Sequence, residues 1–153
     1  MNKKQLTKNE IEELMKTGLS GYNQAVYNFI NLKDYESAYS YVDKKMDFII
    51  DELLDMSDED LTLFAYCCAM VESCVKARAA LKVLFEDADT MKDEEHLDLF
   101  GLIADALCHL KSKHNKKAKA LLNMAVKLEP NDFHFGADEC LIEQAKELLK
   151  KLN

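Results

Sequence analysis

The chain has 153 residues, of which 48% are hydrophobic, and it contains one proline and four glycines. So few turn-forming residues exclude most all-β folds, and the length suits one domain, so we expect a single all-α domain over residues 1–153. The formal net charge of −8 argues against a nucleic-acid partner, because binding to phosphates requires a basic surface.

The sequence also predicts the compartment. No segment has the ~18 uninterrupted apolar residues needed to span a bilayer, and the first ten residues lead into no apolar signal core. Five cysteines, an odd number without regular spacing, suit a reducing compartment in which cysteine acts as a small hydrophobe. We therefore expect a soluble, cytoplasmic protein without membrane contact.

The first predicted element is a short amphipathic arm within residues 1–18. Thr7 and Glu10 have the spacing of a capping box, and Gly18 is typical of a helix end. Ser20 is then expected to cap a second helix. That helix and a long partner helix beginning near Asp34 form a predicted hairpin over residues 19–56.

A second hairpin is predicted over residues 57–92. Ser57 is a helix cap, and the acidic residues after it lie in the first turn, where the helix dipole favours negative charge. A break is expected near Glu72 and Ser73. In the helix that follows, either Ala77 or Ala80 is the alanine that packs against its partner helix.

A third hairpin is predicted over residues 93–130, followed by a capping helix within residues 131–153. Asn115 is expected to cap the second helix of this hairpin, and Pro130 to mark its end. Apolar residues recur at spacings of three and four in both helices, at Phe100, Ile103, Ala104, Leu107, Leu110, Ala118, Leu122 and Ala125.

These patterns resemble the tetratricopeptide repeat. Its residue places are taken in the first hairpin by Tyr22, Val26, Phe29, Tyr35 and Ala38, although Lys45 stands where the family has alanine. The resemblance implies a right-handed superhelix of three hairpins with an N-terminal arm helix and a C-terminal capping helix. The alanines recur about every 40 residues instead of ~34, so a related helical solenoid describes the chain nearly as well.

A second resemblance lies after Pro130. Glu129 and Pro130, followed by Phe133, Phe135, Ala137, Glu139, Cys140 and Leu141, resemble a stretch in the tetratricopeptide chaperones of type III secretion translocators. Those chaperones are small acidic proteins that dimerise through an N-terminal arm and hold a translocator segment on a concave face. The resemblance implies, as an alternative function, a class II type III secretion chaperone, and a homodimer formed through the arm.

The repeat family also implies a binding groove, because the first helix of each hairpin lines the concave face. Carried onto this chain, the partner-binding residues are Asn23, Tyr27, Ile30, Ala65, Ala69, Glu72, Asp105 and Cys108. This mixed apolar and acidic set predicts a protein or peptide partner with an apolar or basic segment. A different register would instead place Tyr27 and Ile30 in the core.

Other kinds of site have little support. The histidines and cysteines lack metal-ligand spacing, and His134 with Cys140 is better explained as structural. No glycine-rich phosphate loop occurs, so we predict no catalytic residue, metal or cofactor. The one basic concentration is either an anion or acidic-peptide contact or a solvated turn, and it comprises Lys111, Lys113, Lys116, Lys117 and Lys119.

The sequence therefore predicts a non-enzymatic adaptor or chaperone that holds a partner segment. A structural or regulatory helical subunit acting through self-association is the alternative from another class.

Overall fold

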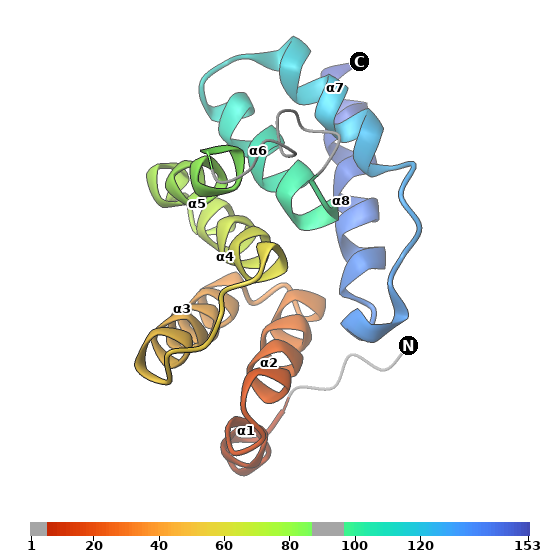
Figure 1. Cartoon of the computed structure of the whole chain (residues 1–153). Helices are drawn as coiled ribbons and strands as arrows, with labels where there is room; N and C mark the ends of the chain where they lie inside the picture. Colours follow the sequence, from red (N-terminus) through yellow and green to blue (C-terminus); the bar gives the residue numbers. More distant parts are fainter. Residues whose placement is uncertain (1–5, 87–96) are drawn as a thin grey trace. The chain divides into compact units, whose positions relative to one another are not determined.

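The computed structural model describes residues 6–86 and 97–153, and every regular element within them is helical (Figure 1). This confirms the all-α fold. The chain divides into two compact units, one of residues 1–56 with 130–140, the other of residues 57–129 with 141–153. In the described parts of the chain, no helix combines the length and apolarity needed to cross a bilayer.

Three helical hairpins follow the arm helix α1 (Lys8–Met15). They pair α2 (Leu19–Asn31) with α3 (Tyr35–Asp51), α4 (Asp58–Met70) with α5 (Cys74–Glu86), and α6 (Leu99–Lys111) with α7 (Asn115–Ala125). The first helix of each has 13 residues, and these helices begin at residues 19, 58 and 99, which agrees with a repeat of about 40 residues. The predicted boundary between residues 92 and 93 lies outside the described residues.

All three hairpins turn in the same way. Lys33, Glu72 and Lys113 each have a positive φ, of 59°, 63° and 63°. The amide of the next residue donates in every case to the carbonyl five positions earlier, at 2.8 to 2.9 Å. Each first helix thus ends in a residue with left-handed backbone conformation, and the bond that follows satisfies a carbonyl at the helix end. A turn of three residues therefore suffices to join the two helices.

The helix starts predicted at Thr7, Ser57 and near Asp34 are confirmed, and those predicted at Ser20 and Asn115 are wrong. Capping boxes form at Thr7 and at Ser57, and each hydroxyl accepts from an amide three residues on. Ser20, however, lies inside α2, whose cap is Gly18 with φ 79°. Asn115 is the first residue of α7 and not its cap, because His114 holds that place without a capping side chain. The helix also ends at Ala125, short of Pro130.

The first unit is built around the α2–α3 hairpin, with α1 packed against α2. Gly21 permits that packing, because a Cβ at this position would overlap the Leu14 carbonyl of α1. Lys45 of α3 is only 1% exposed, and its Nζ donates to Asn23 Oδ1 of α2 at 2.9 Å. The hairpin thus closes around a buried lysine that is bonded to the facing helix.

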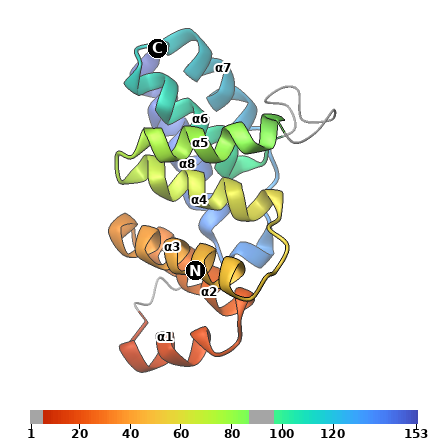
Figure 2. The same ribbon diagram turned by 60° about the vertical axis from the view of Figure 1, so that its left-hand side comes forward.

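The second unit stacks one hairpin on another (Figure 2). Helix α6 packs against α4 and α5 of the hairpin before it. Ala77 is fully buried and lies at the same place in its helix as Ala38 and Ala118, which identifies it as the packing alanine, although Ala80 is buried too.

The predicted C-terminal helix is α8 (Ala137–Leu152), whose last twelve residues belong to the second unit. There, Tyr66 Oη of α4 donates to Gln144 Oε1 at 2.7 Å, and Gln144 Nε2 donates to the Met70 sulfur at 3.1 Å. Leu141 and Ala145 of α8 are fully buried. The helix is therefore joined to α4 by polar contacts through Gln144, while its own apolar side chains are buried.

Candidate partner-binding surfaces

Most of the eight predicted groove residues are inside the protein. Five are buried, namely Tyr27, Ile30, Ala65, Ala69 and Cys108. Asn23 and Asp105 are half-buried and Glu72 is exposed. Tyr27 and Ile30 thus occupy the core, as the alternative register expected. Binding of a partner by these eight residues stays a prediction, and in this conformation Glu72 is the member of the set that is freely accessible.

Tyr27 is covered by another segment of the same chain and not left open to a partner. Residues 131–136, here called the strap, include a short 3₁₀ turn, Asp132–His134, between α7 and α8. The His134 imidazole stacks on the Tyr27 ring with centroids 4.7 Å apart and planes 30° apart. The Phe135 ring follows at 6.4 Å. The strap therefore covers the exposed side of a residue that the sequence assigned to partner binding.

A second contact holds the strap at the end of α2. Asn31 is buried, and its Nδ2 donates to the Phe135 carbonyl at 2.6 Å. Its Oδ1 accepts from Cys140 Sγ at 3.2 Å, which fixes the amide with its donor toward the strap. Asn31 was not predicted from the sequence. An amide at the end of an apolar helix face was the available signal, but its partners are 104 and 109 residues away in the chain.

The strap is shaped by Asp138, a buried carboxylate at the start of α8. Its Oδ2 accepts from the Asn131 amide at 2.7 Å, and its Oδ1 lies 2.7 Å from His134 Nδ1. His134 and Cys140, considered as a pair in the sequence, thus bond to different partners. In residues 6–86 and 97–153 no three histidine, cysteine or acidic side chains come together to hold a metal ion.

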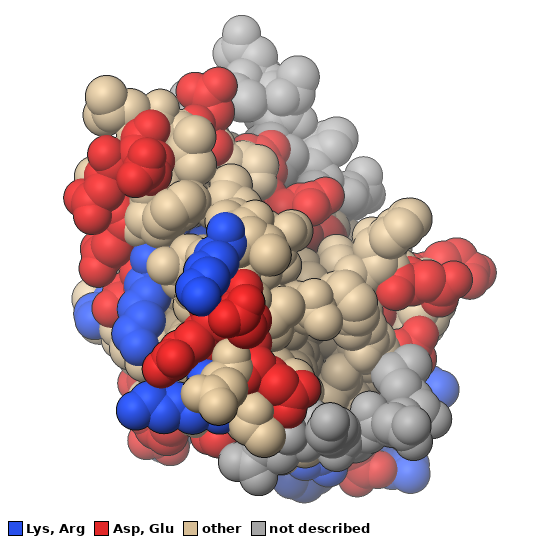
Figure 3. Space-filling view, turned by 90° about the horizontal axis from the view of Figure 1, so that it is seen from below, with Lys and Arg blue, Asp and Glu red and all other residues tan. Residues whose placement is uncertain are grey.

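The turn out of α3 exposes a second surface, here called the acidic corner, formed by residues 50–56. Leu53 is 91% exposed and Ile50 61%, and Leu54 and Met56 are exposed too. Leu53 has φ 54°, and the next amide donates to the Ile49 carbonyl at 2.9 Å, so the helix ending itself fixes the turn. The intervening residues Asp51, Glu52 and Asp55 are all exposed. Figure 3 shows a face on which carboxylates and uncharged side chains are widespread and basic ones fewer.

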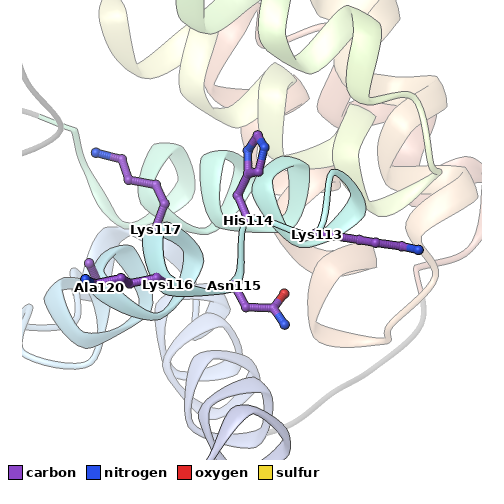
Figure 4. Close-up of a pocket in the computed structure, with 6 residues that line it drawn as sticks. All are labelled: Lys113, His114, Asn115, Lys116, Lys117 and Ala120. Carbon is purple, nitrogen blue, oxygen red and sulfur yellow. The ribbon is translucent and has the colours of Figure 1, made fainter.

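The predicted basic concentration lies at the turn of the third hairpin (Figure 4). Lys113 and Lys117 extend in opposite directions there, so their ammonium groups do not converge. His109 Nδ1 and His114 Nδ1 are 3.3 Å apart, and the other ring nitrogen of His109 lies 3.4 Å from Asp105 Oδ1. A shallow depression beside this turn is lined by Lys113, His114, Asn115, Lys116, Lys117 and Ala120. This geometry favours the solvated turn over a built anion site.

The thiol of Cys108 is buried and unreactive. Burial, and then the neighbouring Cys74 side chain, raise the pKa of its thiol to about 12. The sulfur is therefore protonated near neutral pH and packs as an apolar group.

Comparison with known proteins gave no match: no model of a protein family, no curated protein and no solved structure matches this chain. Both resemblances noted in the sequence thus stay predictions that rest on its residues.

Proposed function

We propose that this chain is a non-enzymatic binding module, an adaptor or cytoplasmic chaperone that holds an apolar or basic segment of a protein partner. The observation that carries the proposal is the acidic corner. Single exposed apolar residues are normal, but four large ones within seven residues are an unusual local concentration of exposed apolar side chains. Such concentrations are typical of sites for other proteins.

The charge of the acidic corner favours one kind of partner. Its three carboxylates lie between the apolar side chains, and residues 50–56 contain no lysine or arginine. A segment that alternates apolar and basic residues matches both features, because charge complementarity guides association and selects partners. A second copy of the same corner is a poor match, since a two-fold contact brings like charges together. This argues against the self-associating subunit.

The hairpins support the same proposal. We propose that they form a tetratricopeptide-like superhelix, in which α6 against α4 and α5 is one step of the stack. Stacked hairpins of this kind present extended surfaces to partners. The secretion-chaperone alternative is a special case of this function, with a translocator as the partner.

A fluorescence polarisation experiment tests the acidic corner. The probes are two labelled amphipathic helical peptides, one of leucine and lysine and the other of leucine and glutamate. We expect the lysine peptide to bind and the glutamate peptide to bind at least tenfold more weakly. Leu53→Asp should weaken binding of the lysine peptide tenfold or more. The matched control is Val75→Asp, an equally exposed apolar position on α5, which should change nothing.

Equal binding of the two peptides, or equal effects of the two substitutions, would contradict the proposal. Light scattering during size-exclusion chromatography tests the alternative. A stable dimer that Leu53→Asp dissociates would favour self-association through this corner.

A further inference from the structure

We propose that the strap is an internal occupant of a binding surface on α2, and that this surface accepts an aromatic segment of a partner when the strap is lifted. The inference rests on the proposed binding function and assigns it a second surface with its own ligand chemistry. The surface consists of the Tyr27 ring and the Asn31 amide.

The side chains of the strap are mostly exposed, in contrast to the surface of α2 that they meet. From residue 127 to residue 135 every side chain is exposed except His134, which is half-buried. Beneath it, Tyr27 and Asn31 of α2 are buried. An irregular segment whose side chains are mostly exposed, and which meets α2 through ring contacts and the Asn31 hydrogen bond, belongs to the low-stability part of a fold, where local opening occurs without global unfolding.

The closed strap also has unfavourable features. Phe135 has φ 54°, a left-handed conformation that strains a bulky residue, and its ring remains 49% exposed. Phe133 is 85% exposed. The closed strap therefore leaves Phe133 largely in water and Phe135 about half in water, and a partner that covers both rings would bury apolar surface that the closed strap does not.

The contacts of the strap define the chemistry that the surface recognises. Tyr27 receives a flat ring, here the imidazole of His134. Asn31 Nδ2 donates to the main-chain carbonyl of Phe135, the residue after His134. Because Cys140 holds the other end of the amide, Asn31 presents a donor and not an acceptor. The matching partner segment carries a ring side chain followed by an aromatic residue whose carbonyl is free.

Occupation by the strap lowers the apparent affinity for such a segment. A ligand that binds only the open form has its affinity reduced by the fraction of molecules that are open. Removing the ring contacts of the strap should therefore strengthen binding of a segment supplied from outside.

The test uses the full chain and a fluorescein-labelled peptide with the sequence of residues 129–137. The opened variant is His134→Ala with Phe135→Ala, and the matched control is Phe133→Ala, which removes an exposed ring from the same strap. We expect the peptide to bind the opened variant at least tenfold more tightly than the wild type or the control. A peptide with alanine at both ring positions should not bind.

Two further measurements identify the surface. Adding Asn31→Asp to the opened variant should weaken peptide binding at least tenfold, because a carboxylate cannot donate to the peptide carbonyl. Hydrogen exchange on the wild type should show faster exchange at the His134 and Phe135 amides than in α2. Equal protection of the strap and α2 would overturn the proposal even if the opened variant fails to fold.

Peptide binding that is no tighter to a folded opened variant than to the wild type would also overturn it. The two proposals fail separately. Leu53→Asp should leave binding of the strap peptide unchanged, so loss of the lysine-peptide result refutes the acidic corner alone.

Discussion

The two units contain hairpins of the same construction but complete them differently. In the second unit one hairpin packs on the next, with α6 against α4 and α5, and the Tyr66 ring of α4 meets the Phe100 ring of α6 edge to face with centroids 5.6 Å apart. In the first unit the hairpin is flanked by α1 and by the strap, neither of which is a repeat. There the interior includes Lys45 and Asn31, and ring pairs form between Tyr22 and Phe48 and between Phe29 and Tyr41.

The difference shows what each kind of neighbour requires. Two regular helices pack closely through their apolar side chains, and the apolar surface that they bury supplies most of the stabilisation. An irregular segment presents free main-chain groups, so it needs a directional contact such as the Asn31 amide. Buried polar groups of the second unit fit this account, because Asp60 and Thr62 serve helix starts, with Thr62 Oγ1 donating to Asp98 at 2.9 Å.

The largest expected effect tests whether the apolar cores of the two units are alike. Ile30 and Ile103 are both fully buried on the first helix of a hairpin. Ile30→Ala and Ile103→Ala should each lower the free energy of unfolding by roughly 3 kcal/mol, from lost transfer energy and the cavity left behind. Urea unfolding followed by circular dichroism measures this, with exposed Val75→Ala as a control. A loss below about 1 kcal/mol at either site would show a loosely packed core.

The next prediction concerns the polar interior of the first unit. Lys45→Ala should cost roughly 2 to 3 kcal/mol, because it removes a long buried side chain and its bond to Asn23. Lys45→Met keeps most of the volume and should cost less than about 1.5 kcal/mol. Urea unfolding of both variants checks the order. If methionine is no better than alanine, the ammonium group and not the packing carries the stabilisation.

A smaller effect separates the first hairpin from the third. Asp34 and His114 occupy the same place, before the second helix, but only Asp34 caps it, accepting from the Ser37 amide at 3.2 Å. Asp34→Ala should cost about 1 kcal/mol, and His114→Asp should stabilise by about 0.5 kcal/mol. Thermal unfolding of both variants measures this. Destabilisation by His114→Asp would mean that the His109–His114 contact outweighs a new cap.

The smallest effect leaves stability unchanged and compares two cysteines. With a pKa of about 12, Cys108 has a thiolate fraction of about one in ten thousand at pH 8. Iodoacetamide should therefore modify Cys108 more slowly than half-buried Cys140, as measured by mass spectrometry of peptides. Because the pKa is raised, the rate at Cys108 should climb as the pH approaches 12. Equal rates in the folded protein and in urea would contradict its burial.

Much of the fold was accessible from local patterns. The capping boxes at Thr7 and Ser57 and the break near Glu72 depend on residues a few positions apart, and all were predicted. The prediction that Ser20 caps a helix was wrong because the helix already begins after Gly18, which has a positive φ. The prediction that Asn115 caps a helix was wrong because Lys113, with its left-handed backbone conformation, fixes the turn and makes His114 the cap residue.

The candidate surfaces were much harder to predict. Helical spacing gives the face on which Tyr27 lies, but not what covers that face. The covering residue, His134, lies in a polar stretch that shows no periodicity, and its contacts depend on the path of the chain after Pro130. The exposure of Leu53 is similarly hidden, because an apolar residue at the end of an apolar helix pattern predicts burial.

The long separation between Asn31 and Phe135 sets an order of events during folding. Each hairpin closes through contacts between neighbouring segments, which cost little loop entropy and form quickly. The strap contact joins residues 104 positions apart, so it closes a loop that contains the whole intervening chain. We therefore expect the strap to dock after the hairpins have formed. A nascent chain still attached to the ribosome would expose the α2 surface until residues 131–136 emerge, and during that interval a partner would meet no competitor.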